Sequence, residues 1–131
     1  MKSAFSLLEL IFVLVLLALI GSYAIPKYMN TKNAAVITTV KRDISTITSS
    51  LQSYFLLHGK VDDLSEVITL GSDDWRIEEN TITYKTAKGD CVFIKVNNQE
   101  EQIELNINET LDNICKKLNE AGVVNRTTPL Y

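Results

Sequence analysis

Residues 5–25 read FSLLELIFVLVLLALIGSYAI, an apolar run of 21 residues with a single charge. As a helix, this run would be about 31 Å long, and the hydrocarbon core of a bilayer is about 30 Å thick. The run therefore predicts a membrane-spanning helix close to the start of the chain. It leaves about a hundred residues, enough for one small domain.

The single charge in the run is Glu9. A carboxylate inside hydrocarbon costs several kcal/mol unless it is neutralised or paired, so an acid there is a candidate functional residue. A plain membrane anchor explains the hydropathy but not Glu9. A cleaved secretory signal would use Lys2 as its basic start and a cut after Ala24, but its apolar segment is normally shorter and lacks an acid. A lipoprotein signal does not fit because no cysteine directly follows the run.

Beyond Pro26, apolar residues recur at alternating spacings of three and four, which predicts one apolar stripe along a continuing helix. The stripe consists of Ile37, Val40, Ile44, Ile47, Leu51 and Tyr54. Gly59 suits the end of this helix, which would extend about 80 Å from Phe5 to His58. Since a small domain cannot bury such a helix, about half of it must project. Gly21 and Pro26 predict a kink or local melting between them, or else mark the membrane boundary.

The rest of the chain predicts an α+β domain in which a small antiparallel sheet of three or four strands packs on the long helix. Alternating or β-prone stretches lie at residues 75–78, 81–86, 91–96 and 102–107, with turn residues between them. A meander is the simplest topology, with its apolar face on the stripe. Asn108 is expected to cap a short final helix over residues 109–121, which Gly122 would end.

Cys91 and Cys115 are the only cysteines, and His58 is the only histidine. These are too few soft ligands for a zinc site, so a disulfide is the favoured interpretation, with two buried free thiols as the alternative. A disulfide requires this part of the chain to lie outside the cytoplasm. In the chain-entropy description, it would contribute roughly 3 to 4 kcal/mol.

Charge and motif content argue against several functions. The 13 basic and 16 acidic residues give a net charge of −3, and residues 1–25 contain one base and one acid, so the remainder also carries −3. Broad attraction to nucleic acid is therefore not expected. The chain has no Gly-x-Ser-x-Gly sequence and no glycine-rich phosphate loop, so we do not expect an enzyme.

The start of the chain, MKSA followed by FSLLELIFVLVLLALIG, resembles the prepilin signature of type IV pilins and type II secretion pseudopilins. The shared features are a short basic leader, a scissile bond, a phenylalanine after the cut and a glutamate as the fifth residue after it. The resemblance implies cleavage between Ala4 and Phe5, N-methylation of Phe5 and a role for Glu9 in assembly. Ala4 stands where the family usually has glycine. Pro26 falls where the family commonly places a helix-bending proline.

The resemblance also implies a division of the chain and a set of partners. Residues 1–4 would be the leader peptide, 5–25 the transmembrane and filament-core helix, and 26–131 a periplasmic or extracellular pilin-like domain that includes the amphipathic helix half 27–58. The implied partners are further copies of this chain in a filament, a prepilin peptidase, an assembly platform in the bacterial inner membrane, and other minor pilins or pseudopilins.

The function implied is that of a structural subunit, with a secretion pseudopilus favoured over a type IV pilus. The alternatives are a competence pilin of a DNA-uptake machinery and a membrane-anchored periplasmic binding module that does not polymerise. Some pseudopilins bind calcium, and the connector 60–74 carries four aspartates, Asp62, Asp63, Asp73 and Asp74. They lack a glycine-spaced ligand loop, so a solvated acidic loop is favoured over calcium, and no other cofactor is expected.

Overall fold

The computed structural model describes residues 4–71 and 73–131, so Lys2 of the leader lies outside the described residues. The chain divides into two units, Met1–Val36 and Ile37–Tyr131, and the first helix contributes to both. The elements are α1 Leu7–His58, α2 Leu64–Val67, β1 Trp75–Ile77, β2 Thr81–Thr86, β3 Gly89–Asn97, β4 Gln102–Ile107, α3 Asn113–Glu120 and β5 Arg126–Pro129. The predicted α+β class is confirmed.

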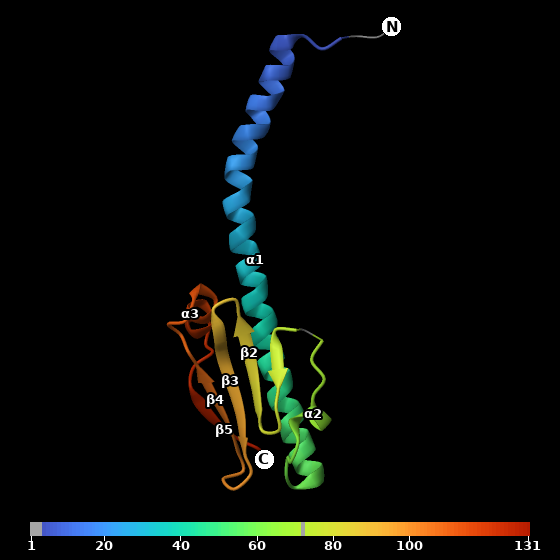
Figure 1. Cartoon of the computed structure of the whole chain (residues 1–131), viewed down its shortest axis with the longest axis vertical. Coiled ribbons are helices and arrows are strands. Elements are labelled where there is room, and N and C mark those ends of the chain that lie inside the picture. Colours follow the sequence, from blue (N-terminus) through green and yellow to red (C-terminus); the bar gives the residue numbers. More distant parts are fainter. Residues whose placement is uncertain (1–3, 72) are drawn as a thin grey trace. The chain divides into compact units, whose positions relative to one another are not determined.

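The sheet of the second unit is an antiparallel meander in the order β1-β2-β3-β4-β5 (Figure 1). Its register places Ile82 opposite Ile94, and Ile94 opposite Leu105, so that large apolar side chains share one face. The strand β5 adds a fifth member to the three or four strands expected. It pairs with β4 from Arg126 opposite Leu105 to Pro129 opposite Gln102.

The core of this unit lies between the sheet and the part of α1 that belongs to it (Figure 1). The helix supplies four buried residues of the predicted stripe, Val40, Ile44, Ile47 and Leu51, and adds Phe55. The sheet supplies Ile82, Tyr84, Val92, Ile94, Val96, Ile103 and Leu105. Two polar contacts join the layers: the Trp75 indole donates to Asp43 (3.1 Å), and the Gln52 amide donates to the Pro129 carbonyl (2.9 Å).

The helix α1 ends as the sequence predicts. Gly59 has a φ of +79°, and its N–H donates to the carbonyl of Phe55 (2.7 Å), which closes the last turn. His58 is exposed and stacks on Tyr54 with ring centroids 4.0 Å apart, so it belongs to the helix end and not to the core. The connector then returns to the domain, because Leu64 of α2 is fully buried.

The final helix begins later than expected, because Asp112 and not Asn108 is its N-cap. The Asp112 carboxylate accepts the N–H of Cys115 (2.9 Å), and α3 starts at Asn113. Asn108 still belongs to the sheet region, since its N–H donates to the carbonyl of Cys91 (2.8 Å). The predicted end is confirmed: Gly122 follows the Ala121 C-cap with a φ of +106°.

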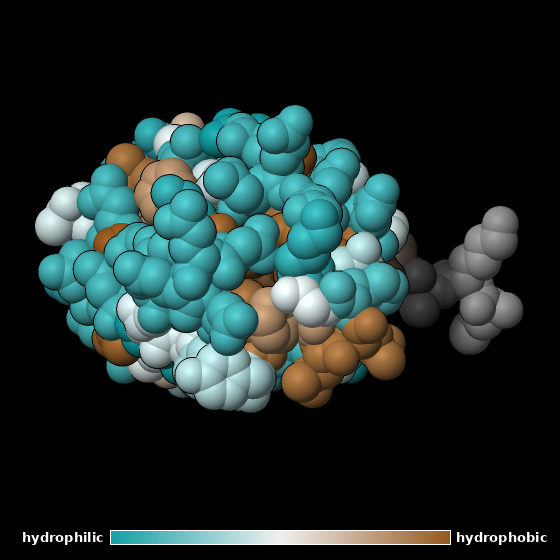
Figure 2. Space-filling model, turned by 90° about the horizontal axis from the view of Figure 1, so that it is seen from below, coloured by the Kyte–Doolittle hydropathy of each residue, from teal (hydrophilic) through white to brown (hydrophobic). Residues whose placement is uncertain are grey.

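The surface of the second unit, seen from below in Figure 2, is mostly hydrophilic with small hydrophobic areas. Two adjacent leucines at the end of α1 are among its exposed apolar residues: Leu56 is 70% exposed and Leu57 is 82% exposed. Exposed apolar residues are common on protein surfaces, so these two leucines alone do not indicate a binding site.

Candidate functional site

The N-terminal part of α1 is an uncovered apolar helix. Residues Leu7–Ile25 have a mean hydropathy of 2.5, and no part of this segment is buried within the chain. Its 19 residues span about 28 Å as a helix, close to the thickness of the hydrocarbon core of a bilayer. Among the residues that the structure describes, one helix is therefore long and apolar enough to cross a membrane. Such a surface requires lipid or other protein around it.

Glu9 lies on the first turn of this helix, three residues after Ser6. The Ser6 hydroxyl accepts the N–H of Glu9 (3.1 Å), and the Ser6 carbonyl accepts the N–H of Leu10 (3.1 Å). Ser6 therefore acts as the N-cap, with Glu9 at the third helical position, which is the spacing of a capping box. A negative charge there also interacts favourably with the helix dipole.

The serine was not recognised from the sequence as a helix start, although Ser-x-x-Glu before an apolar run is the signal for one. The helix dipole explains why an acid is favourable at the start of a helix in water. It does not remove the cost of a carboxylate at the edge of an apolar segment. Glu9 thus remains the candidate functional residue of the first unit.

The predicted cleavage point precedes the helix. Ala4, Phe5 and Ser6 are non-helical, and Phe5 is 79% exposed. A protease must bind the backbone around the bond that it cuts, and a non-helical, exposed segment leaves that backbone accessible. The cut itself, and the methylation of Phe5, remain predictions.

The two residues predicted to bend the helix both lie inside α1. Nothing lies within 4 Å of the position that a side chain on Gly21 would occupy, so the glycine is not required there by a close contact. Two hydroxyls that flank Pro26 in the sequence donate back to helix carbonyls: Ser22 donates to Leu19 (2.9 Å) and Thr31 donates to Lys27 (3.0 Å). The kink at Gly21 and Pro26 remains a prediction.

The two cysteines of the second unit form a disulfide, as predicted, which joins Cys91 of β3 to Cys115 of α3. The pairing of β2 with β3 shifts between Tyr84 and Lys85, so that Tyr84 lies opposite Val92 and Lys85 opposite Asp90. Cys91 is therefore the extra residue of a β-bulge, without a partner on β2. Both cysteines are fully buried, and the bond holds α3 against the end of the sheet.

The four aspartates considered for calcium have local roles or lie apart. Asp62 pairs with Lys60 (2.7 Å), and Asp63 caps α2 by accepting the N–H and the hydroxyl of Ser65. Asp73 and Asp74 are exposed. Among the residues that the structure describes, no three His, Cys, Asp or Glu side chains gather where they could hold a metal ion. Calcium therefore gains no support.

A comparison of the chain with protein-family models, curated proteins and solved structures finds no match.

Proposed function

We propose that the chain is a structural subunit of a filament of the type IV pilus and type II secretion kind, made as a precursor and cut between Ala4 and Phe5. The observation that carries this proposal is Glu9, the fifth residue after the proposed cut, at the start of an apolar helix that is uncovered in the part of the chain that the structure describes. Lipid would surround this helix before assembly, and the helices of neighbouring copies would surround it in the filament.

Cleavage gives Glu9 a partner. The new α-amino group of Phe5 on an incoming copy would pair with the Glu9 carboxylate of its neighbour, while the leucines and isoleucines pack around the pair. A buried ion pair contributes little net stability, but an unpaired buried charge is strongly unfavourable. The pair would therefore act mainly on the axial register between copies.

The proposed location is the bacterial inner membrane, with a single span and the second unit in the periplasm. The Cys91–Cys115 disulfide supports an oxidising compartment for that unit. The basic residues do not dictate this orientation, because Lys27, Lys32, Lys41 and Arg42 follow the span and Lys2 precedes it. Recognition of the leader by a prepilin peptidase would decide the orientation.

The first test is the N-terminus of the chain isolated from membranes. Intact mass and N-terminal sequencing should show a mature chain that begins at a methylated Phe5. A chain that begins at Ile25 would instead identify the apolar run as a secretory signal. A chain that retains Met1 would identify it as an uncut anchor.

The second test is the variant Glu9→Leu, with Glu120→Leu on the exposed face of α3 as a matched control. The Ser6 cap uses the backbone N–H of residue 9, so the leucine variant keeps its helix start and should insert into the membrane normally. It should be missing from sheared filaments, whereas the control should be present. Normal incorporation of Glu9→Leu would contradict the pairing.

The subclass proposed is a type II secretion pseudopilin, with a type IV pilin or a competence pilin as alternatives that differ in their partners. The partners proposed are a prepilin peptidase, an inner-membrane assembly platform and minor pilins or pseudopilins. A membrane-anchored binding module is the rival from another class. Crosslinking separates the two, because a filament subunit should crosslink to copies of itself and a binding module should remain monomeric in the membrane.

A further inference from the structure

The second unit has an open groove of about 440 Å³ between α1 and the edge strand β5. The helix side of the groove presents residues that follow one another at single-turn spacing, and the other side presents β5 and the residues before it. The lining residues are Lys41, Ile44, Ser45, Thr48, Ser49, Gly122, Val123, Arg126 and Thr128. Serine has a small side chain and glycine has none, so the groove has room for a side chain from outside.

Two cations define the charge of this groove. Lys41 lies on its helix side, and Arg126 lies on its strand side, opposite the buried Leu105 of β4. Residues that lie opposite one another on neighbouring strands point to the same face of a sheet, so Arg126 is on the face that packs against α1. No acidic residue is among the described residues that line the groove.

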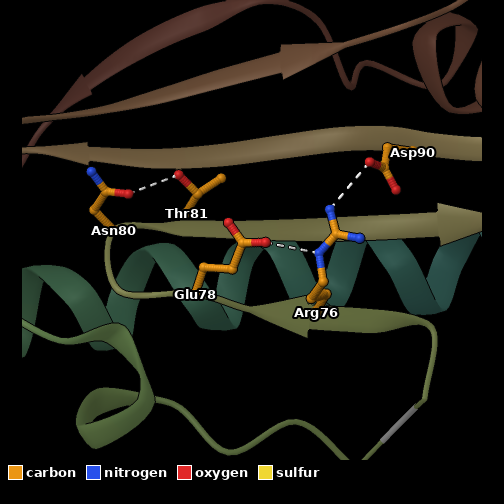
Figure 3. Close-up of polar contacts among 5 residues, drawn as sticks. All are labelled: Arg76, Glu78, Asn80, Thr81 and Asp90. Carbon is orange, nitrogen blue, oxygen red and sulfur yellow. Dashed lines mark hydrogen bonds and ion pairs between the residues drawn. The ribbon is translucent and has the colours of Figure 1, made fainter.

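Neither cation has a carboxylate partner among the described residues, which is also true of most other basic side chains; Arg76 shows how a paired cation is arranged. Figure 3 shows that Arg76 of β1 contacts two carboxylates, Glu78 (3.0 Å) and Asp90 on β3 (3.2 Å). Within the described part of the chain, Lys41 and Arg126 form no such ion pair. A chain with more acids than bases thus leaves two cations beside one open groove, which suits an acidic occupant.

The same unit displays two adjacent acids at the tip of its β3–β4 hairpin, Glu100 and Glu101, and both are exposed. Glu101 has a φ of +53°, in the left-handed region that costs a non-glycine residue about 1 kcal/mol. Glycine or asparagine would relieve this cost. The turn is also held in place, because the Asn97 side chain accepts the N–H groups of Gln99 (3.1 Å) and Glu100 (3.2 Å). The hairpin thus holds a carboxylate at a position where local conformation does not favour one.

The groove and the hairpin tip lie at different levels of the sheet. The tip precedes β4, whereas Arg126 lies opposite Leu105, which is four residues after Glu101, or about 13 Å along the strand. Two complementary surfaces at different levels of one molecule suit a head-to-tail contact, which repeats from copy to copy instead of closing into a dimer.

We infer that the acidic hairpin tip of one copy, Glu100 and Glu101, binds in the Lys41–Arg126 groove of a second copy of this chain. The inference rests on the proposed function, because it names a contact between the globular units of neighbouring subunits. Opposite charges at the contact favour the correct neighbour, and like charges there cost several kcal/mol, so the contact acts on specificity and register.

Charge exchange tests this contact in the full-length protein. The groove variant carries Lys41→Glu and Arg126→Glu, the tip variant carries Glu100→Lys and Glu101→Lys, and a third variant combines all four changes. Lys117→Glu and Glu120→Lys on α3 are the matched controls, because both residues are exposed and lie outside the groove and the tip. The readout is the fraction of mature chain recovered in sheared filaments.

Each two-residue variant should lower that fraction by about tenfold or more, since every 1.4 kcal/mol changes an equilibrium tenfold. The combined variant should recover most of the loss, and the controls should behave as the unaltered chain. Equal assembly of all variants would overturn the contact. The contact would also be overturned if the combined variant were recovered in filaments no better than the groove variant and the tip variant. In the combined variant a glutamate groove faces a lysine tip, so restored attraction should restore assembly.

A zero-length crosslink separates failure of this contact from failure of the proposed function. Carbodiimide treatment of cells that express the unaltered chain should join Lys41 to Glu100 or Glu101 in the dimer band, and mass spectrometry identifies the linked peptides. Filaments without this link would overturn the contact and leave the proposed function standing. The link in a chain that keeps its leader and forms no filaments would support the contact and overturn the proposed function.

Discussion

At the scale of single residues, Asp112 shows how one carboxylate organises the start of α3. Burial opposes its ionisation, but hydrogen bonds from the Cys115 N–H, the Thr86 hydroxyl and the Ile114 N–H, together with the charge of Lys88, outweigh burial and lower the pKa of Asp112 below its usual value of 3.8. A group whose pKa is lower in the folded state stabilises the protein above its unfolded pKa. That contribution is lost as the pH falls through the folded pKa.

Replacing Asp112 separates its charge from its role as a cap. Asp112→Ala should lower the free energy of unfolding by about 1 kcal/mol at neutral pH, because it removes the acceptor for the Cys115 N–H. Asp112→Asn keeps a capping oxygen, so it should cost less at neutral pH and should reduce the loss of stability below pH 4. Urea unfolding at pH 7 and pH 3 measures both. Equal costs for the two variants at pH 7 would show that the cap is unimportant.

Ala4 is the residue where the start of the chain differs from the prepilin signature, and it gives a direct test of processing. If the peptidase prefers glycine before the scissile bond, Ala4→Gly should raise the rate of precursor cleavage, and Ala4→Leu should block it. Pulse-labelled precursor and mature chain, separated by gel, measure the rate. Equal cleavage rates in all three proteins would show that the peptidase does not distinguish between residues at this position.

At the scale of elements, the spacing of apolar residues predicted the structure well where one face of an element is buried. The stripe on α1 and strands β2, β3 and β4 lie where their periodicity places them, because burial on one side produces that periodicity. The strand β5 could not be predicted in this way: its four residues are Arg126, two threonines and Pro129, with no apolar alternation. The start of α3 was misplaced because Asn108 and Asp112 are both suitable caps, and only tertiary contacts decide between them.

Some candidate sites could be predicted from the sequence and one could not. Glu9 and the two cysteines are conspicuous in the sequence, since an acid in an apolar run and a lone pair of cysteines are rare patterns. The groove between α1 and β5 could not be seen in the sequence, because Lys41 and Arg126 are 85 positions apart. They line one groove only when β5 joins the sheet. No local pattern links them.

The α1 stripe gives the strongest test of the predicted core. Leu51→Ala should lower the free energy of unfolding by roughly 2 to 5 kcal/mol, because Leu51 is 0% exposed and its truncation leaves a cavity. Leu57→Ala, on the same helix but 82% exposed, is the matched control and should change stability little. Chemical denaturation of both variants gives the comparison, and similar costs would contradict the burial of the stripe.

At the scale of the whole molecule, the disulfide compensates for the small size of the second unit. Replacing both Cys91 and Cys115 by alanine should cost roughly 3 to 4 kcal/mol in the chain-entropy description, for a loop closed across 24 positions. Small domains are stable by about 5 to 15 kcal/mol, so this is a large share. Thermal unfolding of the variant without reductant measures the cost. The same loss should follow when the unaltered chain is reduced, and the variant should then be insensitive to reductant.

The division into two units predicts that anchoring and folding can be separated. The second unit, Ile37–Tyr131, contains the whole sheet, the disulfide and the buried stripe, whereas the uncovered apolar segment Leu7–Ile25 belongs entirely to the first. Deleting residues 1–36 should therefore give a chain that remains in solution without detergent and keeps the near-ultraviolet circular dichroism signal of the Trp75–Tyr84 ring contact.

The full chain, and a control that lacks only residues 1–4, should sediment with membranes and resist extraction by carbonate. A truncated chain that stays in the membrane fraction would mean that a surface of the second unit binds lipid. A truncated chain that loses the aromatic signal would mean that the second unit needs the first in order to fold.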